Sequence, residues 1–416
     1  MIPNPMSIAR AAGIDMRQEP GRATYTVHRA TTAPADAQHT RICAPTHAGL
    51  VWGSVQVLLE RAAGVPVTAG SFDPPYGRRQ LHLDAGRHFF PVETVLDLLR
   101  LMAWGRLNVL NLHVSENEGY RLPSAAHPEV TSAEHYSEVD VARMCAAADE
   151  LGITVIPSID MPGHLGHVLA ADPWAQLTLD GQPVMGALDV TDPHARELAW
   201  TLLDETQALF RADEVTIGGD EFLDHRLALP ELRRYAEDRF GEGARENDVW
   251  IEFVNATVER LYRRGIRAGV WNDGVQVRRT IDLHPEAIVH YWTRWGSHMA
   301  PPDELVAHTM LNWDADALYF VLKRDHLDRL PTFDSVWDKF AADLYPDHVG
   351  HTRIPGTAGA TFSIWCDEPD ALTSTSVVRL AKWPLMAFAS RCWTVGGLRS
   401  RETVKRALAV TLKEEE

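Results

Sequence analysis

The sequence predicts an α/β protein whose main part is a (β/α)8 TIM barrel, preceded by a small N-terminal α+β domain. Three observations lead to this fold class. Eight short apolar runs typical of strands follow one another between residues 80 and 365, and amphipathic stretches separate many of them. This alternation favours parallel strands joined by right-handed crossovers, and eight strands favour a closed barrel over an open sheet. No G-x-G-x-x-G motif follows the first strand, so a dinucleotide-binding sheet is not indicated.

The repeating part of the chain gives the expected elements directly. Strands are expected at residues 80–86, 107–114, 153–160, 214–221, 266–273, 287–292, 307–313 and 360–365. Amphipathic helices are expected at 91–105, 138–152, 192–210 and 247–265. The later helices are short or unclear in the pattern, so the count of eight units rests mainly on the strands.

The N-terminal part has a different pattern. Residues 1–20 are expected to form a loose leader. Residues 21–75 are expected to form the small α+β domain, because strand-like runs flank a helical stretch at 46–64 that Gly64 would stop. The Pro-rich "SFDPPYGRR" marks a boundary near residue 75, which leaves 76–416 for the barrel.

Composition excludes several classes of protein. The 416 residues are 45% hydrophobic and 23% charged, as in a folded soluble protein, and the formal net charge is −17. An acidic chain is not expected to bind nucleic acid or an anionic membrane. Four widely spaced cysteines form no metal motif, so neither a metal nor a cofactor is expected. The N-terminus shows no signal-peptide core, which predicts a cytoplasmic protein as written, or a secreted one if a leader has been trimmed. The oligomeric state is left open.

Polar side chains gather where the expected strands end. "EVTIGGDEFLDH" ends a strand with two glycines and the adjacent carboxylates Asp220 and Glu221, and "DMPGH" ends another with His164. In a barrel of this kind, catalytic groups lie at the carboxyl ends of the strands. Several tryptophans fall at the same ends, and tryptophan beside carboxylates is typical of a carbohydrate site.

Each feature alone has a plainer interpretation. A strand-end Asp-Glu pair is usually a solvated turn or a helix cap, and tryptophans are more often core than ligand wall. The pair His164 and His167 in "GHLGH" lacks a third metal ligand at a suitable spacing. The functional interpretation gains weight because several such groups share one end of successive strands.

At this point the chain resembles glycoside hydrolase family 20, the β-N-acetylhexosaminidases. The resemblance rests on five motifs in the family's order: "DAGRHFF", "HVSENEGYR", "PSIDMPGH", "TIGGDE" and "SIWCDE". The forms "ENEGY", "WNDG" and "SIW" are most similar to the dispersin-type branch, which cleaves β-1,6-linked poly-N-acetylglucosamine. That branch is compact, whereas this chain keeps a small N-terminal domain.

The resemblance implies a retaining hydrolysis in which the substrate's own acetamido group is the nucleophile. Glu221 would protonate the glycosidic oxygen, and Asp220 would hold the acetamido N–H. The remaining matched positions would bind the sugar: Arg87, Glu116, His164, Trp271, Trp292, Tyr319, Trp365 and Asp367. Among them Glu116 would pair with His164, and Tyr319 would bond the acetamido carbonyl. The partner implied is an oligosaccharide or glycoconjugate that contains N-acetylhexosamine.

Four departures from the family pattern concern specificity. Thr216 stands where the signature has histidine, and Ser158 where it has glutamate. Asp367 replaces a glutamate, and Ala317 lies where tyrosine is common. The leading expectation is an exo-acting β-N-acetylhexosaminidase. A dispersin-like hydrolase, a lacto-N-biosidase and a carbohydrate-binding relic without turnover remain as alternatives.

Overall fold

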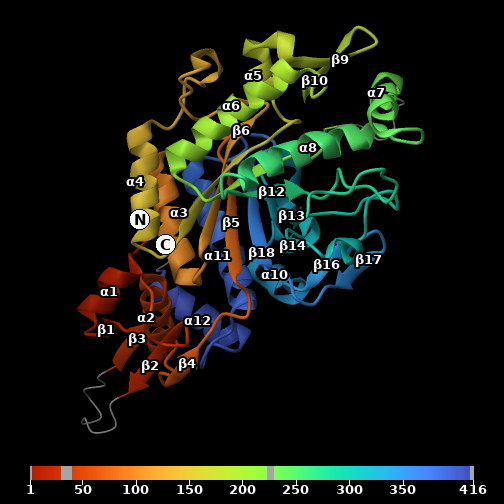
Figure 1. Cartoon of the computed structure of the whole chain (residues 1–416). Coiled ribbons are helices and arrows are strands. Elements are labelled where there is room, and N and C mark those ends of the chain that lie inside the picture. The colour runs from red at the N-terminus through yellow and green to blue at the C-terminus, as the bar shows by residue number, and fades with distance from the viewer. Residues whose placement is uncertain (1, 30–39, 223–228, 413–416) are drawn as a thin grey trace.

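Eight parallel strands close into a barrel in the computed structural model of the chain, which describes residues 2–29, 40–222 and 229–412 (Figure 1). All eight strands coincide with segments that the sequence predicts. Their bounds are β5 Arg78–Asp84, β6 Val109–Glu116, β8 Thr154–Ile159, β11 Glu214–Gly218, β12 Arg267–Trp271, β13 Ala287–Tyr291, β14 Thr309–Asn312 and β18 Gly359–Trp365. Pairing of β14 with β18 joins the last two strands and closes the barrel. The predicted (β/α)8 architecture is therefore confirmed.

The helices lie outside the barrel and cover it (Figure 1). The four predicted ones are found as α3 Val92–Gly105, α4 Glu138–Asp149, α6 Pro193–Phe210 and α8 Glu246–Tyr262. Local chemistry sets their starts: Ser137 and Asp140 form a capping box at α4, and Asp192 caps α6 just before Pro193. The later units are irregular, because residues 272–286 between β12 and β13 contain no helix.

The remaining helices of the barrel region are shorter or come late. They are α5 Gly166–Ala171, α7 Pro230–Phe240, α9 Ala315–Leu318, α10 Phe333–Lys339, α11 Ser374–Cys392 and α12 Arg401–Thr411. Among the described residues, no helix is both long enough and apolar enough to cross a membrane.

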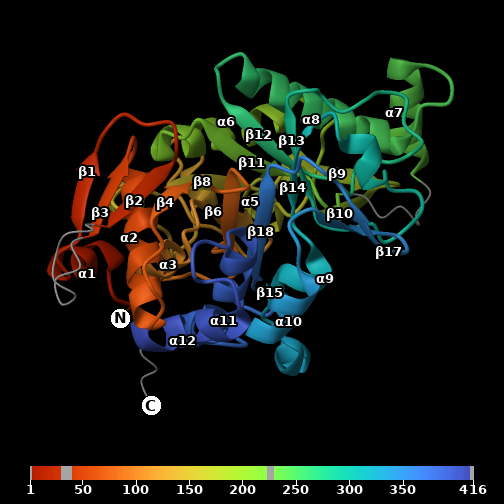
Figure 2. The same cartoon turned by 90° about the horizontal axis from the view of Figure 1, so that it is seen from below.

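The N-terminal unit is a four-stranded sheet with two helices, at the lower left of Figure 1. It contains α1 Pro5–Ala11, β1 Asp15–Gln18, β2 Tyr25–Arg29, β3 Thr40–Ala44, α2 His47–Ala62 and β4 Gly70–Phe72, in the strand order β1-β3-β2-β4. Helix α2 ends just before Gly64, as predicted, and α12 packs against it at the foot of the barrel (Figure 2).

The expectation of a loose leader over residues 1–20 is wrong. Asn4 caps α1 by accepting hydrogen bonds from Met6 and Ser7, and β1 pairs in parallel with β3. A four-residue strand is too short to show a period in the sequence, and its partner lies about 25 residues later, so only the folded chain reveals it. The domain boundary near residue 75 remains a prediction.

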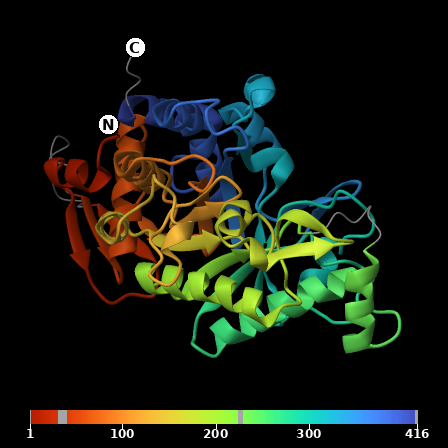
Figure 3. The same cartoon turned by 90° about the horizontal axis from the view of Figure 1, so that it is seen from above.

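Additional short strands extend the loops at the carboxyl ends of the barrel strands, the end seen from above in Figure 3. β7 Gly119–Tyr120 folds back on β6, and β15 Tyr319–Val321 lies beside the end of β18. Two hairpins, β9 Gln176–Leu179 with β10 Gln182–Leu188 and β16 Leu344–Asp347 with β17 Gly350–Arg353, complete this set. Parallel strands bring all their carboxyl ends to one side, which is where the predicted site residues lie.

Candidate active site

The Asp220–Glu221 pair lies in a tight turn directly after β11. The strand ends at Gly218, three residues earlier than predicted, and Glu221 has a left-handed backbone with φ 49°. The two carboxylates are therefore placed by the turn and not by alternation along an extended strand, and both come within 3.6 Å of Nε2 of His164. A left-handed non-glycine residue is strained and persists only where its surroundings hold it.

The two glycines before this pair make the turn sterically possible. Gly218 has φ 72°, and a Cβ atom there would lie 1.5 Å from Oδ1 of Asp160. That same oxygen accepts a hydrogen bond from the N–H of Gly219 at 2.7 Å. Gly219 has φ 101°, and its carbonyl accepts a hydrogen bond from Nε1 of Trp250 at 2.7 Å. Only glycine fits where the backbone must approach Asp160 this closely.

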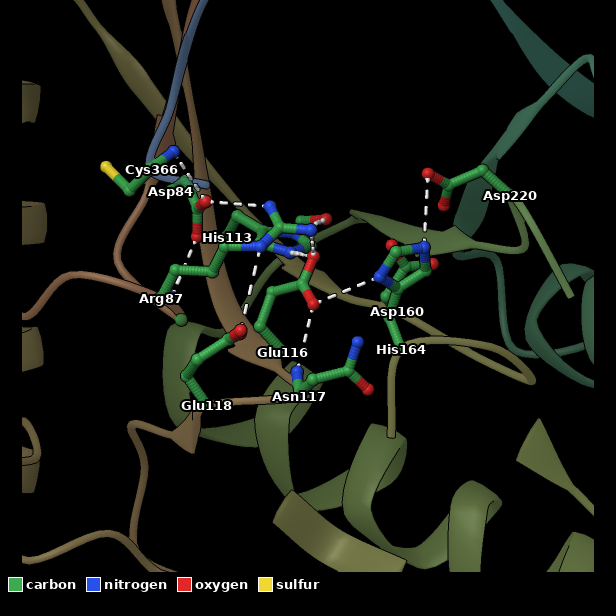
Figure 4. Close-up of polar contacts among 12 residues, drawn as sticks. Asp84, Arg87, His113, Glu116, Asn117, Glu118, Asp160, His164, Asp220 and Cys366 are labelled. Carbon is green, nitrogen blue, oxygen red and sulfur yellow. Dashed lines mark hydrogen bonds and ion pairs between the residues drawn. The ribbon is translucent and has the colours of Figure 1, made fainter. Parts of the chain in front are cut away.

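A buried arginine forms the far end of the polar network, as Figure 4 shows. Nη1 of Arg87 lies 2.9 Å from Asp84 Oδ2, and its Nη2 lies 2.6 Å from Glu116 Oε1. Asp84 also accepts hydrogen bonds from the backbone N–H groups of Arg87 and Cys366. Burial opposes the charge of Arg87, but Asp84 and Glu116 outweigh it and raise its pKa. The guanidinium is thus fixed as a cation at the closed end of the site.

His164 connects Arg87 and Glu116 to the turn that carries Asp220 and Glu221 (Figure 4). Its Nδ1 lies 3.1 Å from Glu116 Oε2, and its Nε2 lies 3.6 Å from both Asp220 Oδ2 and Glu221 Oε2. Burial alone would lower the pKa of His164, but Asp220 and Glu116 together raise it well above its ordinary value. The charge of the protonated imidazole is thus favoured by the acids on both sides of the ring, Glu116 and Asp220.

The two catalytic candidates differ in exposure and surroundings. The Asp220 side chain is 14% exposed, whereas that of Glu221 is 50% exposed. Burial, and then the nearby charge of Asp220, raise the pKa of Glu221. Oδ1 of Asp220 is buried and accepts no N–H of the described residues; its side chain faces the buried carboxyl of Asp160, whose pKa is raised well above its ordinary value by burial and then by Asp220. The Glu221 carboxyl is thus disposed to hold a proton, whereas Asp220 presents acceptor oxygens between His164 and Asp160.

A second buried carboxyl, Asp273, lies directly after β12 and contacts the same turn. Its Oδ2 accepts the backbone N–H of Glu221 at 2.9 Å, and its Oδ1 accepts Nε1 of Trp292 at 3.1 Å. Burial, and then Asp220, raise the pKa of Asp273 to about 7. Asp273 is the last residue of the predicted strand 266–273 and lies in the "WNDG" run, but no role is assigned to it from the sequence.

An aromatic cluster forms the opposite wall. Trp292 and Tyr319 stack almost in parallel, with ring centroids 6.1 Å apart, and Tyr319 lies 5.9 Å from Trp365. Trp271 lies 6.0 Å from Trp365 and 4.5 Å from Trp313. All four predicted aromatic residues therefore converge. Trp313, which ends the seventh predicted strand, belongs to the same cluster and was missed, although its strand-end position was a usable signal.

The polar and aromatic halves meet at Trp365. The guanidinium of Arg87 lies over its ring, 5.5 Å from the centroid. Asp367, two residues later, is exposed at the rim, and burial of its carboxyl raises its pKa against the opposing charge of Arg87. Within the described chain, the contact of Asp367 with Arg87 is electrostatic and not a direct ion pair. Of the predicted site residues, Asp367 is the least closely held.

Two of the departures from the expected motifs are neighbours. Thr216 on β11 pairs in register with Ser158 on β8, below the carboxylates. Each has its own partner: Thr216 accepts from Asn111 at 2.7 Å, and Ser158 contacts His113 at 3.0 Å. These hydrogen bonds satisfy the two small polar side chains inside the barrel.

Two sets of side chains in the site are close enough to hold a metal ion, His113–Glu116–Asp160 and Asp160–His164–Asp220. The ring nitrogens of His164, however, already face Glu116 and the catalytic turn, an arrangement suited to proton transfer. His167 contacts Ser132 instead, so the "GHLGH" histidines do not converge. The expectation that the site uses no metal remains a prediction.

Chemically, this arrangement brings together a carboxyl disposed to hold a proton, a second carboxylate and an aromatic cluster. Such a set can protonate a leaving oxygen and stabilise a positive charge that develops beside it. A planar aromatic wall suits the face of a sugar ring.

Comparison with known proteins agrees with this site. A family model described as glycosyl hydrolase family 20, catalytic domain, matches residues 76–395. A β-hexosaminidase of Emericella nidulans is 32% identical over 390 residues, covering 81% of this chain and 63% of the relative. A lacto-N-biosidase of Bifidobacterium bifidum is 27% identical over 285 residues, covering 66% of this chain and 25% of the relative. The chain thus spans between a quarter and two thirds of the length of these curated relatives.

Solved structures share the fold. An exo-β-N-acetylglucosaminidase of Vibrio harveyi in complex with N-acetylglucosamine superposes with a TM-score of 0.75 at 17% identity, covering 96% of this chain and 67% of that one. Dispersin B superposes with a TM-score of 0.62 at 21% identity, covering 76% of this chain and 99% of its own. The family match over the whole barrel, on a site with these carboxylates, shows that the chain belongs to glycosyl hydrolase family 20.

Proposed function

We propose that the chain is a retaining β-N-acetylhexosaminidase that removes terminal β-linked N-acetylglucosamine or N-acetylgalactosamine from oligosaccharides or glycoconjugates. One observation carries the proposal: a left-handed turn holds two adjacent carboxyls beside His164, a largely buried Asp220 that can accept an N–H and a Glu221 whose raised pKa lets it hold a proton. These are the two functions that a substrate-assisted hydrolysis requires of the enzyme. The family is an exception to the scheme in which an enzyme carboxylate is the nucleophile.

In the first step, the acetamido oxygen of the substrate attacks its own anomeric carbon. The bond from that carbon to the glycosidic oxygen breaks, and the proton of Glu221 passes to the departing oxygen. Asp220 accepts the acetamido N–H and stabilises the positive oxazolinium ring that forms. An attack within one molecule reaches effective molarities of about 10⁵ M or more when the groups are well oriented.

In the second step, water opens the oxazolinium ring. Glu221, now a carboxylate, takes a proton from the water as its oxygen bonds to the anomeric carbon. The ring carbon–oxygen bond breaks and restores the acetamido group, so the sugar leaves with its original β configuration. The enzyme is returned with Glu221 protonated.

The other residues would hold the sugar. Arg87, fixed by Asp84 and Glu116, would bind hydroxyls at the non-reducing end. The cluster of Trp271, Trp292 and Trp365 would enclose the acetamido methyl group, with the Tyr319 hydroxyl on its carbonyl and Asp367 on an outer hydroxyl.

The test is hydrolysis of p-nitrophenyl N-acetyl-β-glucosaminide by wild type and Glu221→Gln. We expect kcat/KM to fall by about 10² to 10⁴, the usual contribution of a general acid and base. Glu231→Gln on the exposed face of α7 is the matched control and should keep full activity. Equal rates for wild type and Glu221→Gln would reject the proposal.

Two alternatives within the class concern the substrate. The likeness to dispersin B in fold keeps β-1,6 poly-N-acetylglucosamine as a candidate substrate, and the likeness to a lacto-N-biosidase keeps release of a disaccharide. The buried Arg87–Asp84 pair favours removal of a single terminal sugar, because a fixed guanidinium can bind the hydroxyls of a chain end. Defined β-1,4 and β-1,6 oligomers, with product length measured, distinguish the three. A binding relic would bind sugar without turnover and is excluded if an oxazoline-type inhibitor blocks measurable hydrolysis.

A further inference from the structure

Asp273 is a buried carboxyl at the edge of the site that neither carries out the proposed chemistry nor contacts a cation among the described residues. Its two oxygens each accept one neutral N–H, from the backbone of Glu221 at 2.9 Å and from the indole of Trp292 at 3.1 Å. Burying a carboxyl is costly unless it is hydrogen-bonded, so both contacts are needed to keep it there. The two groups that it joins belong to different walls of the pocket.

The Glu221 side chain has few contacts of its own. It is half exposed, and the nearest charged partner found among the described residues is His164 at 3.6 Å. Its backbone, in contrast, is left-handed and is held by Asp273. The position of the Glu221 carboxyl is therefore set mainly by its backbone.

Trp292 is held in the same way on its other side. Its backbone N–H donates to Asn272 at 2.8 Å, and Asn272 in turn donates to the carbonyl of Thr293. Asp273 fixes the indole itself. The consecutive residues Asn272 and Asp273 thus hold both the main chain and the ring of Trp292.

We propose that Asp273 is a positioning residue that binds the Glu221 backbone and the Trp292 ring at the same time, and so fixes the distance between the proton donor and the sugar-facing wall. This inference rests on the proposed role of Glu221. A misplacement of about 1 Å in a catalytic group can cost about 10²-fold in rate, so a fixed distance of this kind matters for proton transfer.

The test variant is Asp273→Asn, which has nearly the same shape. An asparagine has one acceptor oxygen and one NH2 group, so it can accept from Glu221 or from Trp292 but not from both. We expect kcat/KM to fall by about 10²-fold on N,N′-diacetylchitobiose, whose leaving oxygen needs a proton. On the 2,4-dinitrophenyl glycoside, whose leaving group needs no proton, the fall should be far smaller.

The pH profile gives a second readout that a purely structural role would not move. The groups that face Glu221 are Asp220 on its own turn, His164 after β8, Arg87 after β5, Glu116 on β6 and Asp273 after β12. Asp273→Asn should shift the alkaline limb of kcat/KM, while the profile of the matched control stays in place.

Asp314→Asn is that control. Asp314 is also a buried carboxyl directly after a barrel strand, but it caps α9 and pairs with His351. It should show no leaving-group dependence in its activity. Equal losses on both substrates in Asp273→Asn, no loss at all, or the same dependence in Asp314→Asn would each overturn the inference.

If Asp273→Asn does not fold, Trp292→Phe serves instead. It removes one of the two donors and leaves the other, so a small loss that depends on the leaving group is expected. A change in KM alone would overturn the inference. An active Glu221→Gln enzyme would instead overturn the proposed function, so the two failures can be told apart.

Discussion

The two ends of strand β5 each carry an arginine that packs on tryptophan, and they have opposite surroundings. At the lower end, Arg79 is fully buried between the rings of Trp52 and Trp393, 4.7 and 5.0 Å from their centroids. At the upper end, Arg87 lies 5.5 Å from the Trp365 centroid and pairs with two carboxylates.

The difference lies in the partners and not in the arginine–tryptophan contact. The guanidinium of Arg79 donates to the backbone carbonyls of Arg106 at 3.0 Å and Tyr76 at 2.8 Å, and burial lowers its pKa to about 10. Arg87 is surrounded by acids, which raise its pKa. A cation enclosed by rings and carbonyls joins the N-terminal unit to the barrel. Arg87, in contrast, is paired with Asp84 and Glu116, and Glu116 contacts His164 beside the turn of Asp220 and Glu221, so this cation belongs to the candidate site.

The largest effect that would test this contrast comes from Arg87→Lys. Lysine keeps the charge but loses the planar fork that contacts Asp84 and Glu116 together. We expect kcat/KM on the aryl glycoside to fall by about 10²-fold, or about 2.7 kcal/mol. Arg79→Lys, measured in parallel, should keep its kcat/KM. Full activity in Arg87→Lys would show that Arg87, like Arg79, is not needed for activity.

A smaller effect, on stability alone, is expected from Arg79→Lys. The change removes the stacking between two rings and leaves buried carbonyls without their donors, which together cost about 2 kcal/mol. Urea unfolding of the variant and wild type measures this difference. If the free energy of unfolding is unchanged while kcat/KM falls, the contact of Arg79 with Trp52 and Trp393 does not stabilise the fold.

The smallest effect sharpens the electrostatic side of the comparison. The pKa of Glu221 is raised by burial and then by Asp220, so Asp220→Asn should lower it. A general acid works only while it is protonated. The alkaline limb of the residual activity should therefore lie at a lower pH in Asp220→Asn than in wild type. The displacement should be below about one pH unit. Asp282→Asn, on an exposed carboxyl, is the control for kcat/KM against pH, and a limb that moves upward would contradict the assignment.

The sequence was most informative where the pattern is local. Apolar runs placed all eight barrel strands, and the motifs named side chains that the structure brings into one network, from Arg87 through His164 to Glu221. It failed where a feature depends on distant partners. β1 exists because it pairs with β3, and the turn at Glu221 depends on a hydrogen bond to Asp273, 52 residues away. Neither the pairing of β1 with β3 nor this hydrogen bond produces a periodic pattern in the sequence.

Within the site, the residues that the sequence missed share one property. Asp273 and Trp313 support other side chains, and such support is visible only from contacts. The departures at Thr216 and Ser158 were equally hard to interpret one at a time. Their register as neighbours on β11 and β8 shows that the two departures lie side by side in the barrel.

A single side chain, Glu116, has one oxygen against the guanidinium of Arg87 and the other against the imidazole of His164. An engineer who wished to admit a different terminal sugar would have to alter the first contact and would thereby disturb the second. Under the proposed function, sugar selectivity at Arg87 and acidity at Glu221 would therefore change together, which narrows the routes by which new substrates can evolve on this scaffold.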